Sequence, residues 1–132
     1  MKKNNNGFSL VELIIVIAIM AVLVGVLAPQ FIKYVEQSRR SRDIQAAQEI
    51  REACLADIAD GLITGGSSSK TVSANTFSSI TEDVSVVGNS TAVAHGTRFV
   101  AEYNATTGVC VVKAGAYDLT NDLEASAYKT VS

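Results

Sequence analysis

Residues 2–12 read Lys-Lys-Asn-Asn-Asn-Gly-Phe-Ser-Leu-Val-Glu, and residues 13–32, which follow, carry no charge. A helix of about 20 apolar residues, rising about 1.5 Å per residue, is long enough to cross the hydrocarbon core of a bilayer. Lys2 and Lys3 favour a cytoplasmic N-terminus under the positive-inside rule. Glu12 lies at the edge of the span, where a carboxylate is costly. It therefore marks a functional site that needs a partner.

The run from Gly7 to Glu12, Gly-Phe-Ser-Leu-Val-Glu, resembles the class III leader of type IV prepilins. That leader is short and basic, ends in glycine, and is followed by Phe-[Ser/Thr]-Leu-x-Glu and a hydrophobic helix. Pro29 stands where the family commonly carries a helix-bending proline. Many members also have a glycine near Ala21, whereas here the glycine of the span is Gly25. The resemblance covers roughly residues 2–37, and the remainder shows no family-specific motif.

The resemblance implies a processing reaction at Gly7 and Phe8. In the family, a membrane-embedded prepilin peptidase cuts after the glycine and methylates the new amine, so the mature chain would begin at N-methyl-Phe8. It also implies an assembly role for Glu12, whose partner would be the Phe8 amine of an adjacent subunit. Residues 1–7 are then the leader peptide, and residues 8–32 the transmembrane and filament-core segment. Residues 33–132 hold the amphipathic helix half and a soluble pilin β-domain.

The function implied is that of a structural subunit of a type IV pilus. Such a chain crosses the inner or cytoplasmic membrane once before assembly and lies in an extracellular pilus afterwards. Its partners would be copies of itself in a helical filament, the peptidase, and an assembly platform with its ATPase. Gly25 and Pro29 predict a bend, because Pro29 has no N–H to donate to the carbonyl of Gly25.

Two ordinary interpretations of the N-terminus compete with this one. A secretory signal has an apolar region of about 7–15 residues and a small-residue cleavage site, but this run is longer and Pro29 would follow the weak site at residues 26–28 directly. A plain membrane anchor explains neither Glu12 nor the Gly-Phe junction. The cations of residues 33–42 outnumber those of the leader and oppose the positive-inside orientation. The specific leader motif overrules that count.

Beyond the span, apolar residues recur at steps of three or four, the spacing of an amphipathic helix. They are Ile44, Ala47, Ile50, Cys54, Ile58 and Leu62, with Leu55 beside them. Charged residues are expected largely off this stripe: Arg39, Arg40, Asp43, Glu49, Arg51, Glu52 and Asp57. The helix is therefore expected to continue to about Ala59 and to end before Gly61, Gly65 and Gly66. The arginines of residues 39–42 could pair with Glu36, Asp43 or Glu49 of neighbouring subunits.

The remainder predicts a small antiparallel sheet. Residues 65–81 are rich in Gly, Ser and Thr and are expected to form a loop. Residues 84–87 suit a short strand, and residues 98–104 and 109–113 form a hairpin candidate. The tail from residue 116 is expected to be a surface loop with one short strand or turn. The fold class is α+β: a long N-terminal helix, half transmembrane and half amphipathic, packed against a small antiparallel β-sheet.

Candidate catalytic chemistry is sparse. The single histidine, His95, lies in a turn-like stretch, and the chain has no Cys-x-x-Cys, phosphate-binding glycine loop or dinucleotide fingerprint. We therefore expect no enzyme, no catalytic residue and no cofactor. Asp118, Asn121, Asp122 and Glu124 supply oxygens of the kind that calcium prefers, but they lack the spacing of a calcium loop. A solvated acidic turn and no metal are expected there.

Cys54 and Cys110 are the two cysteines of the chain. In an exported protein such a pair suggests a disulfide. Cys54 belongs to the apolar helix stripe, and Cys110 to a predicted strand. Many pilins use their disulfide to staple a C-terminal loop, a habit that this placement does not fit. The sequence leaves both a bridge and two buried thiols open, because it does not fix the Cβ geometry.

Two rivals share the N-terminal motif. One is a pseudopilin of a type II secretion system, and the other is a competence or minor pilin that binds DNA. A net charge of −2 disfavours DNA as a partner. The Ser/Thr/Gly-rich loop fits a surface-exposed pilin better than a periplasmic piston. A monomeric lipid-anchored binding module is disfavoured by Glu12.

Overall fold

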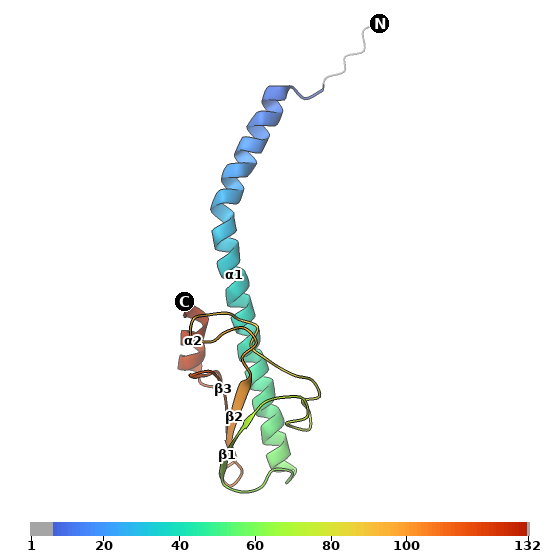
Figure 1. Ribbon diagram of the computed structural model, residues 1–132, viewed down its shortest axis with the longest axis vertical. Helices are drawn as coiled ribbons and strands as arrows, with labels where there is room; N and C mark the ends of the chain where they lie inside the picture. Colours follow the sequence, from blue (N-terminus) through green and yellow to red (C-terminus); the bar gives the residue numbers. More distant parts are fainter. Residues whose placement is uncertain (1–6, 132) are drawn as a thin grey trace. The chain divides into compact units, whose positions relative to one another are not determined.

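The chain is a long helix followed by a small sheet and a short helix (Figure 1). The computed structural model describes residues 7–131. Its elements, in chain order, are α1 (Leu10–Ala59), β1 (Ser67–Thr71), β2 (Phe99–Asn104), β3 (Val109–Ala114), β4 (Tyr117–Asp118) and α2 (Asp122–Thr130). The predicted α+β class is confirmed. The chain divides into two compact units after Val35, so that α1 contributes to both.

The first unit consists of the N-terminal part of α1. Every residue from Leu10 to Tyr34 is exposed, although most of them are large and apolar. The α-helical assignment continues through Gly25 and Pro29. Its apolar residues lie on every side of the helix, and none of them is buried by the part of the chain that the structure describes.

The end of α1 confirms the boundary that the glycines predicted. Gly61 has a φ of +75°, which a residue without Cβ adopts readily. Its N–H donates to the carbonyl of Ile58 at 3.1 Å, and the N–H of Leu62 donates to the carbonyl of Asp57 at 2.9 Å. This pair of hydrogen bonds is a Schellman motif, which satisfies the last carbonyls of the helix.

The sheet has four antiparallel strands in the order β1-β2-β3-β4. The predicted hairpin is confirmed, with Phe99 opposite Ala114 and Asn104 opposite Val109. The Asn104 Oδ1 accepts hydrogen bonds from the N–H groups of Thr106 and Thr107 at 2.9 and 3.2 Å. An asparagine that binds its own backbone two residues on is a common initiator of turns.

The core lies between the second half of α1 and one face of the sheet. Phe99, Ala101 and Tyr103 share that face, and the buried residues of β3 are Cys110, Val112 and Ala114. From α1 come Ala47, Ile50, Ala53 and Cys54. The helical spacing predicted that Leu62 belongs to the apolar stripe of the helix, and this is wrong, because Leu62 is 66% exposed. It follows Gly61, where the helix has already ended.

Three other expectations were wrong. The serine-rich stretch contains β1, whose five residues are all exposed. An edge strand without alternating apolar residues gives no strand pattern, and β1 pairs with β2 through the backbone ladder and the hydrogen bond between the Asn104 and Ser67 side chains. Residues 84–87 form no strand beyond a single bridge between Ser85 and Arg98. The tail does contain the expected short strand, β4, but the rest is not a loop: it forms α2, which buries Ala125 and Tyr128 and is capped by the Asn121 side chain.

Candidate functional site

The predicted processing site precedes α1. Gly7, Phe8 and Ser9 lie outside regular structure, and all three are exposed. A Cβ built on Gly7 would meet nothing within 4 Å, and Phe8 is 85% exposed. A peptidase can therefore approach the Gly7–Phe8 bond without unfolding any element. Lys2 and Lys3, the predicted basic leader residues, lie outside the described residues.

Glu12 lies in the first turn of α1 and makes a reciprocal contact with Ser9, the residue before the helix. The backbone N–H of Ser9 donates to Glu12 Oε2 at 2.8 Å, and the backbone N–H of Glu12 donates to Ser9 Oγ at 3.3 Å. This is a capping box, which satisfies two of the free N–H groups at the start of a helix. The carboxylate also lies at the positive end of the helix dipole. Sequence reasoning missed the capping role of Ser9, although Ser-x-x-Glu before an apolar run is the signature of this cap.

The surroundings of Glu12 are apolar. Phe8, Leu13, Ile15 and Val16 line a shallow hollow beside it. Within the described residues, α1 is the helix that is long and apolar enough, by length and composition, to cross a membrane. Glu12 is the only charged residue between Leu10 and Ile32. The segment thus presents one carboxylate on an otherwise uncharged surface.

A second charged group lies in the other unit, where α1 meets the sheet domain. Asp43 is buried, at 1% exposure, and its carboxylate accepts three hydrogen bonds. The backbone N–H groups of Val87 and Gly88 donate at 2.7 and 2.8 Å, and the Tyr128 hydroxyl donates at 2.6 Å. Two successive backbone N–H groups thus bind the two oxygens of one buried carboxylate, and hydrogen bonds to the charged form stabilise it. Burial and the hydrogen bond to Asp43 raise the pKa of Tyr128, which stays protonated and able to donate.

Arg40, one helical turn before Asp43, connects α1 to the C-terminal end of α2. Its Nε donates to Glu36 Oε1 at 3.0 Å, and its guanidinium donates to the carbonyls of Asn89, Tyr128 and Lys129 at 3.2 Å each. It also donates to the carbonyl of Val131. Because carbonyls at a helix C-terminus carry partial negative charge, a buried guanidinium is stabilised there. Glu36 in turn accepts the N–H of Asn89 at 2.6 Å.

The expectation that Arg40, Asp43 and Asp57 lie off the buried stripe was therefore wrong. All three side chains are buried. Their burial is tolerated because their polar atoms bind backbone groups far away in the sequence; the Asp57 carboxylate, for example, accepts the N–H of Ser78 at 2.9 Å. Arg40, Glu36 and Asp43 were expected to pair with neighbouring subunits, but in the structure all three bind groups of their own chain. Arg39, Arg42 and Glu49 of the predicted cluster remain exposed. We call Glu36, Arg40, Asp43, Gly88 and Tyr128 the polar anchor.

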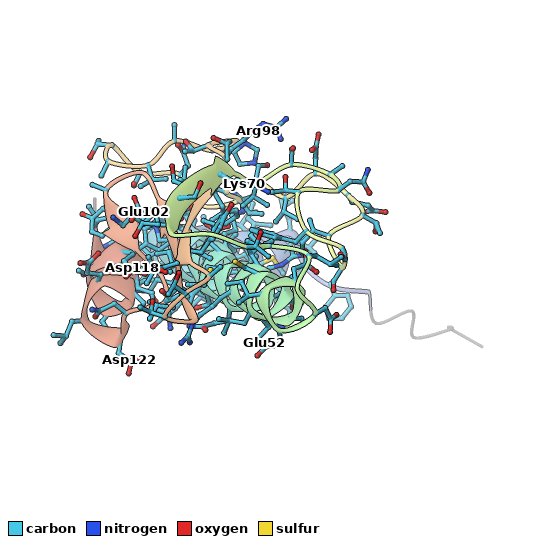
Figure 2. All side chains as sticks on the ribbon, turned by 90° about the horizontal axis from the view of Figure 1, so that it is seen from below. Glu52, Lys70, Arg98, Glu102, Asp118 and Asp122 are labelled. Carbon is cyan, nitrogen blue, oxygen red and sulfur yellow. The ribbon has the colours of Figure 1, made fainter. Side chains whose placement is uncertain are left out.

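The remaining candidates have structural roles or none. His95 is exposed in a turn. In the predicted acidic cluster, Asn121 caps α2, Glu124 accepts the N–H of Asp118 at 2.5 Å, and Asp118 accepts the Thr120 hydroxyl. No group of three metal-binding side chains occurs in residues 7–131. Charged side chains such as Arg98 and Asp122 lie around the outside of this unit (Figure 2).

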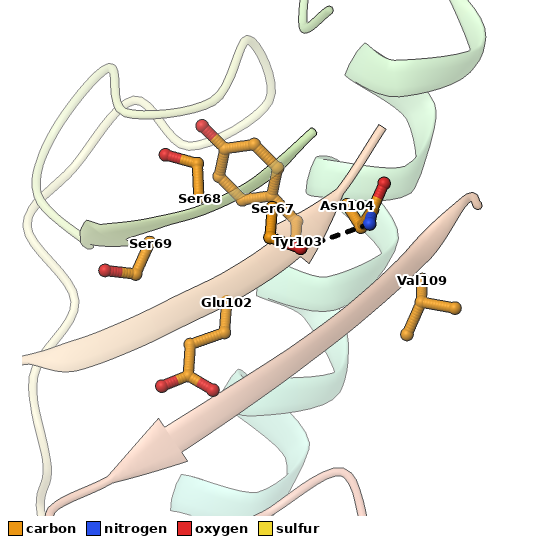
Figure 3. Close-up of a pocket in the computed structure, with 7 residues that line it drawn as sticks. All are labelled: Ser67, Ser68, Ser69, Glu102, Tyr103, Asn104 and Val109. Carbon is orange, nitrogen blue, oxygen red and sulfur yellow. Dashed lines mark hydrogen bonds between the residues drawn. The ribbon is translucent and has the colours of Figure 1, made fainter. Parts of the chain in front are cut away.

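An open hollow lies over neighbouring strands of the sheet, with lining residues from β1, β2 and the start of β3 (Figure 3). It is lined by Ser67, Ser68, Ser69, Glu102, Tyr103, Asn104 and Val109. Asn104 Nδ2 donates to Ser67 Oγ at 3.1 Å, and the Glu102 carboxylate is paired with Lys113 Nζ at 2.9 Å. Two of the polar side chains that line the hollow, Asn104 and Ser67, therefore bind each other, and Glu102 is held by a residue outside the lining.

Cys54 and Cys110, the predicted cysteine pair, are both buried as free thiols. They lie within hydrogen-bonding reach of each other, one on α1 and the other on β3. Sequence reasoning could not decide whether the Cys110 face of β3 meets the helix. The structure places it there.

An accessible Gly-Phe junction, a helix-capping glutamate and an exposed apolar helix follow one another at the start of the described residues. The model of the prokaryotic N-terminal methylation motif matches residues 2–28. The chain is 38% identical over 64 residues to the type IV major fimbrial protein FimA of Dichelobacter nodosus, a match that covers 46% of this chain and 41% of the relative. A second FimA of that organism is 35% identical over 65 residues.

Over its N-terminal half the chain is similar to these type IV major fimbrial proteins. It matches only about two fifths of the length of these curated relatives. No solved structure matches the chain.

Proposed function

We propose that the protein is a structural subunit of a type IV pilus filament, assembled through the exposed apolar part of α1. The observation that carries the proposal is the surface from Leu10 to Tyr34, on which every residue is exposed. Apolar surface gains about 25 cal/mol per Å² when it leaves water. A surface of this size is therefore covered by lipid, by other chains, or by each in turn.

Both coverings fit one life cycle. Before assembly, α1 crosses the inner or cytoplasmic membrane, and the second unit lies on the far side from the leader. Afterwards, the same surface packs against the α1 helices of other subunits in an extracellular pilus. The contact between neighbours joins different patches of each copy, and such contacts produce an open helical filament instead of a closed ring. We also propose that α1 bends at Gly25 and Pro29, because Pro29 has no N–H to donate to the carbonyl of Gly25.

Glu12 gives the assembly a charged contact. Cleavage between Gly7 and Phe8 by a prepilin peptidase frees the Phe8 amine, and methylation keeps it cationic. A buried carboxylate is tolerated when an ammonium lies beside it. We assign the Phe8 amine of an adjacent subunit as this partner. The capping box with Ser9 holds the carboxylate at the start of α1 until that partner arrives.

The second unit supplies the outer body of the filament and carries no catalytic group. An assembly platform and its ATPase, together with the peptidase, act on this subunit. DNA is not favoured as a partner, because the chain has a net charge of −2 and the buried Arg40 is unavailable to phosphate.

The test compares Glu12→Ala, Glu12→Gln and Ser9→Ala in the native host. Both Glu12 variants should be inserted, cleaved to begin at Phe8 and folded, but should give few or no filaments. Ser9→Ala removes the hydroxyl of the cap and keeps the carboxylate, so filament yield should remain close to that of the wild type. Sheared filaments and membrane-bound subunit are quantified by immunoblot, and the N-terminus by mass spectrometry. Normal filament yield from Glu12→Ala would refute the proposed assembly contact.

A further inference from the structure

The exposed side of the second half of α1 carries two blocks of charge. Arg39 and Arg42 form the basic block, and Glu49 and Glu52 form the acidic block; all four side chains are exposed. Glu52, for example, points outward from the helix (Figure 2). The other side of the same stretch is buried in the core of the second unit. The two blocks therefore lie on a surface that the sheet domain leaves open.

Within a single helix this arrangement of charges is unfavourable. Side chains three or four residues apart are neighbours on a helix surface, and like charges at that spacing repel. Arg39 and Arg42 are three residues apart, and so are Glu49 and Glu52. Arg42 and Glu49, the nearest opposite charges of the two blocks, are seven residues apart, which is about 10 Å along a helix and too far for an ion pair. The stability of α1 alone does not account for this pattern.

The blocks also have no ionic partner elsewhere in the chain. In the part of the chain that the structure describes, no ion pair is formed by any of the four side chains. Glu36 and Asp43 lie within one helical turn of Arg39, but both are held by the hydrogen bonds of the polar anchor. Glu49 accepts a long hydrogen bond, of 3.5 Å, from the uncharged amide of Gln45. A partner of opposite charge must come from another molecule.

We propose that the basic block of one subunit binds the acidic block of a neighbouring subunit, with the two α1 helices parallel and offset along their axes. This contact rests on the proposed function, since it identifies a surface by which copies of the chain meet. An offset of seven to ten residues, about 10–15 Å, brings Arg42 level with Glu49 or Glu52 of the neighbour. Parallel helices without an offset would set each block against its own copy, which is repulsive. The blocks therefore select the register between neighbouring subunits.

The contact also propagates. Each subunit binds one neighbour through its basic block and another through its acidic block, so that both blocks stay open at the ends of any row of subunits. Contacts between different patches of identical chains give open filaments when they do not close into a ring. The order of charges along the chain, with the cation before the carboxylate, is also that of Phe8 and Glu12 in the proposed assembly contact.

A second copy of the chain fits this surface better than a membrane does. Anionic lipid headgroups attract basic side chains, so they would account for Arg39 and Arg42. The same headgroups would repel Glu49 and Glu52, which lie on the same exposed side of the helix. A neighbouring subunit offers both signs of charge and accounts for both blocks.

The test reverses each block in the full chain in its native host. The acidic variant is Arg39→Glu/Arg42→Glu, and the basic variant is Glu49→Arg/Glu52→Arg. Each variant alone places like charges across the contact, and should lower the ratio of sheared filament to membrane-bound subunit by about tenfold or more. Glu82→Arg is the control, because it reverses an exposed carboxylate outside α1 and should leave the filament yield unchanged.

Two combinations should restore the filaments. A chain with all four substitutions again carries opposite charges in its two blocks, and its yield should return to within about threefold of the wild type. Co-expression of the acidic and the basic variant should also restore the yield, since each chain then finds the opposite charge on the other. Only a contact between subunits predicts this second restoration.

The outcomes separate this contact from the proposed function. Wild-type filament yield from both variants would refute the contact and leave assembly through Glu12 standing. A loss that neither combination restores would also overturn it, and would assign the blocks to another partner such as anionic lipid. Failure of the proposed function itself would appear as wild-type chain that is absent from all filaments.

A direct measurement uses Arg42→Lys, which keeps the charge and adds a reactive amine. A zero-length carbodiimide reagent, applied to sheared filaments, should join this amine to Glu49 or Glu52 of another copy and give a ladder of covalent multimers. Mass spectrometry of the digest identifies the joined peptides. In the matched control Arg42→Lys/Glu49→Gln/Glu52→Gln that cross-link cannot form. Intact filaments of Arg42→Lys without the cross-linked peptide would refute the contact.

Discussion

Asp43→Asn tests whether the polar anchor holds the sheet domain on α1. The native carboxylate accepts through both oxygens, from Val87 on one side and from Gly88 and Tyr128 on the other. An amide has only one oxygen. In either orientation its NH₂ group faces a backbone N–H, and at least one buried donor is left without a partner.

The expected cost follows from these contacts. An unsatisfied buried donor costs about 1–3 kcal/mol, and the hydrogen bonds that remain lose the additional strength that a charged acceptor gives them. We expect Asp43→Asn to lower the free energy of unfolding by about 3–5 kcal/mol, the range seen when one partner of a buried charged group is removed. For a domain of this size the melting temperature should fall by at least about 12 °C.

The assay is thermal unfolding of the full chain in detergent, followed by near-UV circular dichroism. Asp60→Asn is the matched control: it makes the same chemical change just beyond α1 at an exposed position, and should alter stability by less than about 0.5 kcal/mol. If Asp43→Asn had the same melting temperature as Asp60→Asn and the wild type, the anchor would contribute nothing to holding the domain together.

Two further predictions concern single positions in the second unit. A Cβ at Gly88 would lie 2.9 Å from Arg40 Cγ, Asp43 Oδ2 and the Tyr128 hydroxyl, so Gly88→Ala should cost about 1–3 kcal/mol by urea titration, whereas Gly66→Ala, which meets open space, should be nearly neutral. The hydrogen bond from Arg98 lowers the pKa of Asp83. The stability from this ion pair is present above the unfolded pKa and is lost as pH falls through the folded one. Asp83→Asn should therefore flatten the fall in urea midpoint below about pH 4, and a fall unchanged from that of the wild type would contradict this assignment.

Local sequence signals predicted the elements that depend on neighbouring residues. The long helix, its end before Gly61 and the hairpin from Phe99 to Ala114 each follow from spacing or turn chemistry within a few residues. The N-terminal motif could also be read directly, because its residues are consecutive. Even the role of Ser9 as the helix cap could have been recognised, since the capping box spans only four positions.

The polar anchor could not be predicted in the same way. Asp43 and Arg40 receive their partners from residues 44 to 91 positions away, and helical spacing places a charged side chain on the solvent side by default. Likewise, β1 is made of exposed serine, lysine and threonine, so only its backbone pairing with β2 identifies it as a strand. These features arise from tertiary contacts, which a periodic pattern does not encode.

The position of the polar anchor along α1 explains why charged residues are used there. Up to Tyr34 the helix is apolar and exposed, and from Glu36 onward it binds the sheet domain, first through charged groups and then through Ala47, Ile50 and Cys54. An apolar contact at the start of this second part would compete with lipid and with neighbouring helices for the same surface. A buried carboxylate and guanidinium with specific backbone partners cannot be exchanged for lipid without leaving charges unpaired. Under the proposed function, the anchor lies where the helix surface assigned to the filament ends and the surface that packs on the sheet domain begins.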